Sequence, residues 1–226
     1  MDEIGGLETQ IAQLANEIEF LKNQLTAQAN EISAERRSQA DPLCDFVKQI
    51  LTKLSMSDAE MQIEFVKEER LGPNGFDNIQ FLFKTNKGGQ FLPLKKVASG
   101  GELSRIMLAI KKILSDNTKL PTIIFDEIDT GVSGEISNKI AHIMQQMAKN
   151  MQVITITHLP QIAAMGRAHF RVRKLRGEAQ TLSTIERLSE DERITEISEM
   201  IGGQEASNTA MESAKELLQK FAGTFY

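Results

Sequence analysis

Residues 122–125 read TIIF, and residues 152–157 read QVITIT. Both stretches are short, apolar and rich in β-branched side chains, which is typical of a strand buried inside a sheet. Between them, a row of isoleucines recurs at helical spacing from about residue 133 to residue 150. Two buried strands that flank a helix predict a parallel βαβ unit, and this unit decides the α/β class of the chain.

The remaining elements follow from the same periodicities and from turn residues. Asp41-Pro42 is typical of a helix start, and Ser189 with Glu192 predicts a capping box. The predicted strands are residues 61–68 and 78–85, with a later hairpin around residues 176–178. The other predicted helices are residues 102–115, about 190–201 and about 207–221.

Composition limits the class of protein. The chain has 226 residues, 25% of them charged, and a net charge of −5, so its overall charge gives no strong attraction to nucleic acid. One cysteine, Cys44, excludes an internal disulfide and a cluster of several cysteines. No apolar run approaches the ~20 residues of a membrane span, and the acidic N-terminus lacks a signal-peptide core. We therefore expect a cytoplasmic protein.

The N-terminal segment carries a heptad pattern. Its apolar positions, spaced by four and three residues, are Leu7, Ile11, Leu14, Ile18, Leu21 and Leu25, and Gln28 and Ile32 continue the register. This spacing predicts a coiled-coil helix over about residues 7–35. The alternative is an amphipathic helix packed on a globular core. A coiled coil needs a partner helix from another chain or from a part of the protein outside this sequence.

Two acidic residues and one histidine follow the buried strands. Asp126 and Glu127 end the first strand, and His158 ends the second, so all three lie at the carboxyl edge where ligands bind in parallel sheets. One carboxylate could hold hydrated Mg²⁺ while the other faces an attacking water, and the imidazole could contact a phosphate. The alternatives are solvated acids at a strand end and a histidine in a turn.

A Ser-Gly-Gly sequence precedes the helix at residues 102–115. Backbone amides at a helix N-terminus attract anions, and glycines allow a phosphate to approach closely, so Ser99, Gly100 and Gly101 are candidates for phosphate binding. An ordinary N-cap is the alternative. The chain contains no Gly-x-x-x-x-Gly-Lys-Ser/Thr loop. The Ser-Gly-Gly helix start, the strand that ends in Asp-Glu and the strand that ends in His follow one another along the chain. This order indicates a phosphate-binding site more strongly than any one of the three segments alone.

These segments resemble a known family. SGGE at 99–102 resembles the signature motif of ABC-type ATPases, TIIFDE at 122–127 their Walker B strand, and DTGVSG at 129–134 their D-loop. ITITH at 154–158 resembles their switch histidine segment. The strings KVASGGELSRIMLAIK, FDEIDTGVSG and THLPQIAAMG are similar to the RecN family of bacterial DNA repair proteins, within the SMC-like branch. This likeness covers most of residues 75–222.

Some positions depart from the general ABC pattern. Glu102 stands where transporters usually have Gln, and Ala98 where many ABC proteins have Leu. Both departures are expected in the SMC-like branch and in the RecN family. Related cohesin-like or Rad50-like repair ATPases remain an alternative family.

The resemblance implies a fold and a division of the chain. It implies the C-terminal lobe of an ABC/SMC-type ATPase head with a mostly parallel sheet, flanking helices and the fold of P-loop NTPases, plus an N-terminal coiled-coil arm helix. Residues 1–40 would be the arm and residues 41–226 half of the head. The chain would be the C-terminal part, about half of the complete protein, and the phosphate loop would lie in the N-terminal half.

The resemblance also implies roles for single residues toward ATP and Mg²⁺. Asp126 would hold Mg²⁺ through water, Glu127 would polarise the attacking water, and His158 would contact the γ-phosphate. Ser99, Gly100, Gly101 and Glu102 would meet the γ-phosphate bound to a second head, and Asp129 would cross the dimer axis. For Arg105, contact with phosphate, support of Glu102 and a solvated position all remain open.

The implied function is ATP-dependent DNA repair. ATP binding would join two heads and hydrolysis would release them, and the chain alone would be inactive. The implied partners are the N-terminal half, a second copy and DNA. A non-hydrolysing coiled-coil tether is the alternative. Arg167, His169, Arg171 and Arg173 share one parity and could contact a DNA backbone or form a solvated sheet face.

Overall fold

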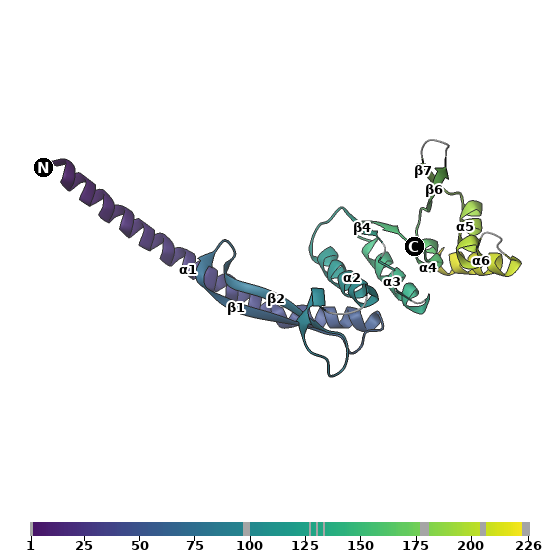
Figure 1. Cartoon of the computed structure of the whole chain (residues 1–226), viewed down its shortest axis with the longest axis horizontal. Helices are drawn as coiled ribbons and strands as arrows, with labels where there is room; N and C mark the ends of the chain where they lie inside the picture. Colours follow the sequence, from purple (N-terminus) through teal and green to yellow (C-terminus); the bar gives the residue numbers. More distant parts are fainter. Residues whose placement is uncertain are drawn as a thin grey trace. The chain divides into compact units, whose positions relative to one another are not determined.

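The computed structural model describes residues 2–96, 100–126, 128–129, 131–132, 134–176, 181–203 and 207–222. The chain forms two compact units (Figure 1). Residues 1–49 and 58–97 make up the first unit, and residues 50–57 and 98–226 make up the second.

The first unit combines a long helix with an antiparallel sheet. Helix α1 (Asp2–Lys53) supplies the helix, and the sheet has the strand order β1 (Glu60–Gly72), β2 (Gly75–Lys84) and β3 (Leu92–Pro93). The 3-10 helix η1 (Leu94–Lys96) follows. The two predicted strands at 61–68 and 78–85 are confirmed as β1 and β2, whose register pairs Met61 with Phe83, both buried.

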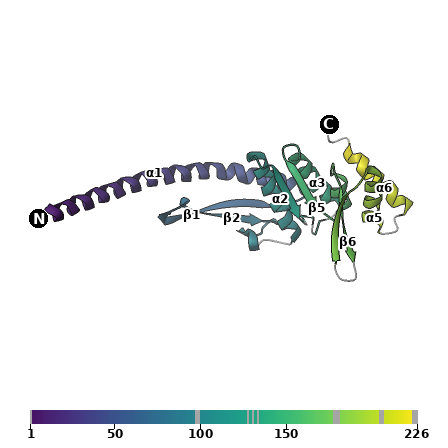
Figure 2. The ribbon, with the colours of Figure 1, turned by 90° about the horizontal axis from the view of Figure 1, so that it is seen from above.

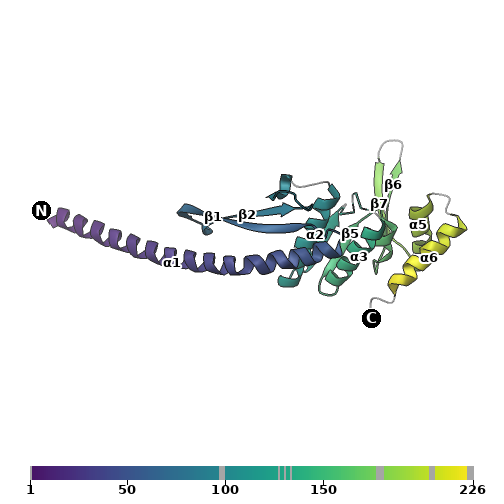
Figure 3. The same ribbon diagram turned by 90° about the horizontal axis from the view of Figure 1, so that it is seen from below.

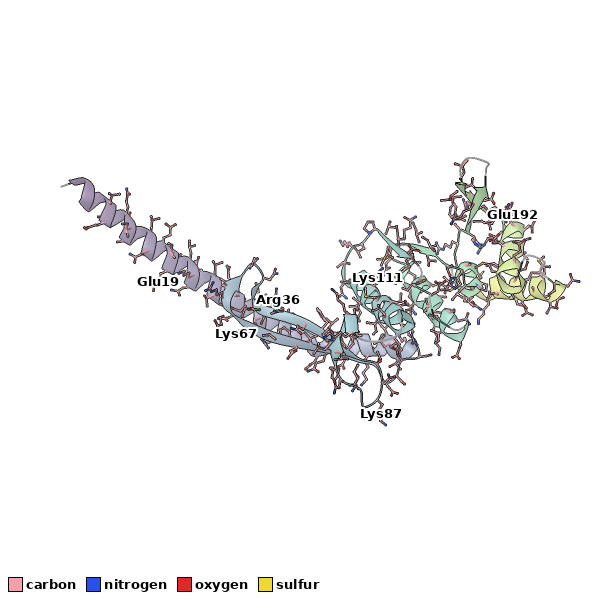
Figure 4. All side chains as sticks on the ribbon, in the orientation of Figure 1. Glu19, Arg36, Lys67, Lys87, Lys111 and Glu192 are labelled. Carbon is pink, nitrogen blue, oxygen red and sulfur yellow. The ribbon has the colours of Figure 1, made fainter. Side chains whose placement is uncertain are left out.

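Asp77 holds β2 against α1. Its carboxylate accepts a hydrogen bond of 2.9 Å from Ser33 Oγ. The same carboxylate forms an ion pair of 3.2 Å with Arg37. Arg36, labelled in Figure 4, donates to the carbonyl of Asn74 at 2.8 Å. The Arg37 guanidinium also lies over the Phe65 ring, 4.5 Å from its centroid. These contacts fix the hairpin along the stretch of α1 that follows Ala29.

The predicted helix start at Asp41-Pro42 is wrong, because α1 continues through Pro42 to Lys53. A proline inside a helix removes one backbone hydrogen bond and crowds the preceding turn, at a cost of about 3 kcal/mol. Tertiary packing on both sides of Pro42 offsets this cost: Ala29 and Val47 are buried. The sequence rule considers only the local backbone and therefore places a boundary where the helix continues.

The heptad positions of α1 are exposed. The predicted helix over residues 7–35 is confirmed, and Figure 3 shows α1 continuing past the turn between β1 and β2 toward the N-terminus. The side chains of Leu7, Ile11, Leu14, Ile18, Leu21, Leu25 and Ile32 are 42–67% exposed. In the described part of the chain, nothing covers this apolar row, so the coiled-coil partner stays a prediction.

The second unit is an α/β arrangement (Figure 2). Its elements are α2 (Gly100–Asn117), β4 (Thr122–Asp126), α3 (Gly134–Met147), β5 (Gln152–Ile156), α4 (Pro160–Ala164), β6 (Phe170–Arg176), β7 (Thr181–Arg187), α5 (Glu190–Gly202) and α6 (Asn208–Ala222). Strands β4 and β5 pair in parallel, from Thr122 with Gln152 to Asp126 with Ile156. The predicted βαβ unit, and with it the α/β fold class, is confirmed.

One apolar core holds the second unit together. It includes Leu108 of α2, Phe125 of β4, Ile140 of α3 and Ile197 of α5, all at most 1% exposed. Three helices and a strand therefore share this core. Alternate residues of the two parallel strands point to the opposite face of the pair. On that face Ile124, Ile154 and Ile156 are exposed. The β4–β5 pair therefore buries one face and leaves an apolar face uncovered in the described part of the chain.

The closing elements match their sequence patterns. Strands β6 and β7 form the predicted hairpin, whose turn lies outside the described residues. The capping box at the start of α5 is confirmed, since Ser189 N–H donates to Glu192 Oε2 at 2.8 Å and Glu192 N–H donates to Ser189 Oγ. The hydrogen bond from the Ser189 amide lowers the pKa of Glu192. Among the described residues, no helix is long and apolar enough to cross a bilayer.

Candidate functional site

The carboxyl ends of β4 and β5 bring two predicted residues to one edge. Asp126 is the last residue of β4 and pairs with Ile156, the last residue of β5, and His158 follows two residues later. The Asp126 residue is exposed, and the His158 side chain is 72% exposed. Both side chains are thus available to a ligand at this edge. Glu127, the predicted water-polarising residue, lies outside the described residues.

The start of α2 supplies the backbone groups of the second predicted segment. Gly100 begins this 18-residue helix, and a methyl group placed on Gly100 would meet no atom within 4 Å. Gly101 is buried, and Glu102 is in the first turn. Backbone amides at the start of a helix attract anions. Ser99 lies outside the described residues, so its capping or phosphate role stays a prediction.

The turn after β4 lies against the start of α2. Gly131 has φ +72°, a backbone conformation that side chains with a Cβ rarely adopt. A methyl group on Gly131 would lie 3.5 Å from the amide nitrogen of Gly101 and 3.7 Å from its Cα. The segment resembling a D-loop is therefore in van der Waals range of the segment resembling a signature motif.

The same turn contacts the residues that follow β5. Asp129, 1% exposed, accepts hydrogen bonds at Oδ2 from the hydroxyl of Thr157 and, at 3.3 Å, from the backbone amide of His158. The His158 Nδ1 atom lies 3.6 Å from the same oxygen. Thr157 Oγ1 in turn accepts from the Leu159 amide at 3.0 Å. The turn thus connects the start of α2 with the switch segment.

These contacts show where Asp129 points. Its carboxylate is directed into its own chain, toward residues 157 and 158. The expected contact across a dimer axis is not tested here and stays a prediction. Among the described residues, the second oxygen, Oδ1, is buried without a hydrogen-bond partner.

The Arg105 side chain donates hydrogen bonds to two backbone carbonyls. Its Nε donates to the carbonyl of Gly101 at 3.1 Å, and one terminal nitrogen donates to the carbonyl of Leu54 at 3.2 Å. Arg105 therefore ties the first turn of α2 to the segment that follows α1 in the second unit. A purely solvated arginine, one of the three alternatives for this position, is wrong.

The basic strand β6 is partly neutralised. Arg171 makes hydrogen-bonded ion pairs with Glu186 of β7 and Glu196 of α5, and only 16% of its side chain is exposed. Arg173 lies 3.8 Å from Glu186. Burial lowers the pKa of His169, and the nearby Arg193 lowers it further. Because Arg171 is paired within the chain and mostly covered, its contacts favour neither DNA contact nor a solvated position at this residue.

Sequence reasoning missed two contributors to this site. Thr157 fixes the switch segment through its hydroxyl, and nothing in a single sequence distinguishes it from other strand-end threonines. Helix α4 was also missed, although Pro160 at its first position is a recognised start signal. At Gly131, the Asp-Thr-Gly turn could have indicated a left-handed residue.

The arrangement defines a fold class: a helix start, a turn and two strand ends lie near one another in the fold of SMC head domains. Solved structures agree in fold. An SMC head bound to the C-terminal winged-helix domain of ScpA has a TM-score of 0.55 and 19% identity, covering 76% of this chain and 49% of its own. A structure from work on ATP-driven dimerisation of SMC ATPases has a TM-score of 0.52 and 18% identity, with 75% and 97% covered.

Curated proteins of similar sequence indicate a smaller group within this fold class. The DNA repair protein RecN of Haemophilus influenzae is 38% identical over 196 residues, which is 86% of this chain and 35% of that protein. RecN of Bacillus subtilis is 36% identical over 235 residues, which is 97% of this chain and 41% of that protein. The chain is similar to RecN proteins, as its motifs indicate, and spans about two fifths of the RecN proteins it matches. No family model matches the chain.

Proposed function

We propose that this chain is the C-terminal part of an ATP-dependent DNA repair protein of the RecN type. Residues 1–40 would be an arm helix and residues 41–226 half of an ATPase head. One observation carries the proposal: Gly131 lies near Gly101, and Asp129 accepts hydrogen bonds from Thr157 and His158. These contacts support a single site built from the three segments that resemble ATPase motifs.

The residues at the strand edge fit a magnesium nucleotide. Mg²⁺ usually keeps several waters and takes one or two carboxylates together with substrate phosphates. Asp126 supplies one exposed carboxylate at the end of β4, and no cluster of three possible metal ligands occurs among the described residues. A single carboxylate suits a hydrated ion better than a caged one. When bound, Mg²⁺ would neutralise charge on the phosphates.

Each residue then has a separate task. Asp126 holds the hydrated ion, Glu127 accepts a hydrogen bond from the attacking water, and His158 contacts the terminal phosphate and orients a water there. The exposure of His158 supports this role, because the imidazole is open to a ligand while its backbone amide is fixed by Asp129.

The helix start of α2 serves a nucleotide on a second head. Gly100 is exposed at the start of α2, which suits a phosphate that arrives from outside this chain. Ser99, Gly100, Gly101 and Glu102 would meet that γ-phosphate. ATP binding would then join two heads and hydrolysis would separate them.

Two uncovered apolar surfaces support a missing partner. Ile124, Ile154 and Ile156 leave one face of the β4–β5 pair open, and the heptad row of α1 is exposed. Burial of apolar area of this kind is worth about 25 cal/mol per Å², so both faces favour a covering partner. The N-terminal half would supply the phosphate loop for the head and a helix for the arm. DNA would be the substrate of the whole protein, in the bacterial cytoplasm at the nucleoid.

Two variants of the full-length protein test the proposal. Glu127→Gln keeps the shape but removes the charge that polarises water, so ATP hydrolysis should fall by about 10²–10⁴-fold while ATP-bound dimers accumulate. Ser99→Arg places bulk and charge where the second head's phosphate must enter, so ATP should bind without dimerisation. Sizing chromatography with ATP and nucleotide affinity measure both results.

The chain alone provides a further test. It should show no ATP hydrolysis, because it carries no phosphate loop, and addition of the N-terminal half should restore nucleotide binding. Robust turnover by the purified chain would contradict the proposed division of the head. A Ser99→Arg variant that dimerises normally with ATP would return Ser99 to the role of an ordinary helix cap. ATP binding without any turnover in the full-length protein would instead favour the non-hydrolysing tether.

A further inference from the structure

The Asp129 carboxylate is the most deeply buried acid of the second unit among the described residues, and it contacts the switch segment. Its side chain has no exposed area, and Oδ2 accepts from both the Thr157 hydroxyl and the His158 amide. A buried carboxylate is costly unless hydrogen-bonded, so these donors hold Asp129 in place as much as it holds them.

We propose that Asp129 is the positioning residue of His158 within one chain. It accepts one hydrogen bond from the Thr157 hydroxyl and one from the His158 backbone amide, and it orients the imidazole through the Nδ1 side. The catalytic consequence rests on the proposed ATPase function, whereas the positioning itself rests on the geometry of this chain.

The orientation of the imidazole follows from the distances. Nδ1 is the ring nitrogen near the carboxylate, 3.6 Å from Oδ2, so the negative charge favours a proton on Nδ1. The remaining nitrogen, Nε2, is on the far side of the ring, and the side chain is largely exposed. Asp129 therefore determines which nitrogen His158 presents to a ligand. Carboxylates that orient histidines in this way are common behind metal-bound imidazoles.

The same geometry opposes a direct role for Asp129 in a second head. Its side chain is fully buried, so a donor from another chain can reach it only if the turn at 128–132 opens and the bonds to Thr157 and His158 break. Gly131, two residues later, lies against Gly101, and this contact would be lost as well. The turn can respond to a second head through its backbone while Asp129 keeps its contacts.

Two variants separate the two parts of this role. Asp129→Asn keeps the shape and a carbonyl oxygen that accepts from Thr157, but it removes the charge near Nδ1. Thr157→Val keeps the charge and removes the hydroxyl that joins Asp129 to the Leu159 amide. Asp77→Asn is the matched control, because Asp77 is a similarly buried carboxylate that accepts from a hydroxyl, Ser33 Oγ, in the first unit.

The readout is nuclear magnetic resonance of the 226-residue chain. The chain has only three histidines, so their imidazole nitrogen signals can be assigned by substituting each in turn. At a pH where the imidazoles are neutral, wild-type His158 should carry its proton on Nδ1, and Asp129→Asn should abolish that preference. Thr157→Val should shift the backbone amide signals of His158 and Leu159. Asp77→Asn should change none of these signals.

Three results would overturn the proposal. One is an unchanged His158 imidazole in folded Asp129→Asn, and another is unchanged amide signals in Thr157→Val. The third is an equal change at His158 in Asp77→Asn, which would indicate a general loss of packing. If Asp129→Asn does not fold, the Thr157→Val amide shifts decide the question.

The full-length protein tests the catalytic consequence. Asp129→Asn should lower kcat for ATP hydrolysis by about 10–100-fold, as for other residues that orient a functional histidine, with ATP affinity unchanged. An unchanged kcat would remove the catalytic consequence. Absence of turnover in the wild-type protein would instead contradict the proposed function and leave the His158 signals as an independent measure of positioning.

Discussion

Gly131 tests whether the turn after β4 depends on its contact with α2. Its φ of +72° places it in the left-handed region, and its backbone lies against Gly101. Gly88 offers a matched position, because it has φ +77° but no atom within 4 Å of an added methyl group. Alanine and leucine at both positions therefore separate backbone strain from steric contact.

The expected magnitudes follow from these distances. Alanine in the left-handed region costs roughly 1–2 kcal/mol at either position. A methyl group at Gly131, 3.5 Å from the Gly101 nitrogen, is in ordinary van der Waals contact and adds little. Leucine extends beyond that distance and must displace either the turn or the start of α2, at a further cost of about 1–3 kcal/mol. At Gly88 the leucine side chain projects into open space and should add nothing.

Urea or thermal unfolding of the four variants measures the difference. Gly131→Leu should be less stable than Gly131→Ala, whereas Gly88→Leu and Gly88→Ala should be equal within about 0.5 kcal/mol. The reasoning fails if leucine and alanine differ by the same amount at both positions, because the turn would then not lie against α2. It also fails if Gly131→Ala leaves the free energy of unfolding unchanged, because the left-handed backbone would then cost nothing.

The other predictions concern pH, capping and the arm. Burial lowers the pKa of His169, so the folded chain binds that proton less readily than the unfolded chain and stability falls as pH drops below about 6.5. In thermal melts, His169→Gln should reduce this fall; an unchanged fall would contradict the assignment. Ser189→Ala removes the α5 cap and should cost about 1 kcal/mol in urea unfolding, and no loss would show the cap to be unimportant. Leu14→Asp with Leu21→Asp should abolish association with the N-terminal half while the circular dichroism of the α/β unit persists, and unfolding of that unit would contradict an arm.

Elements with a strong period were predictable from the sequence. The strands β4 and β5 and the capping box at Ser189 were predicted because the pattern of each lies within a few consecutive residues. Pro42 misled the prediction for the opposite reason: the contacts that hold α1 just before Pro42 come from a hairpin more than twenty residues away. A local rule carries no information about such packing.

In the candidate site, too, local sequence patterns predicted some positions but not the contacts made by tertiary packing. The sequence order placed Asp126 and His158 at one sheet edge, because the edge of a parallel sheet follows from strand direction alone. It did not predict that Asp129 turns inward to Thr157, since the direction of a side chain in a turn depends on which donors the folded chain brings near it. Only the folded chain shows that one turn contacts both neighbouring segments.

The uncovered face of the β4–β5 pair also bears on solubility. TIIF and VITIT are uncharged, β-branched segments, and segments of this kind form intermolecular β-sheets when their faces or edges are free. The residues that carry Asp126 and His158 to the sheet edge are therefore prone to aggregation. Polar replacements at Ile124 or Ile154 would be expected to keep the separate chain in solution at higher concentration. The same replacements would weaken the surface on which a covering lobe must pack, so in this protein resistance to aggregation and completion of the head oppose each other.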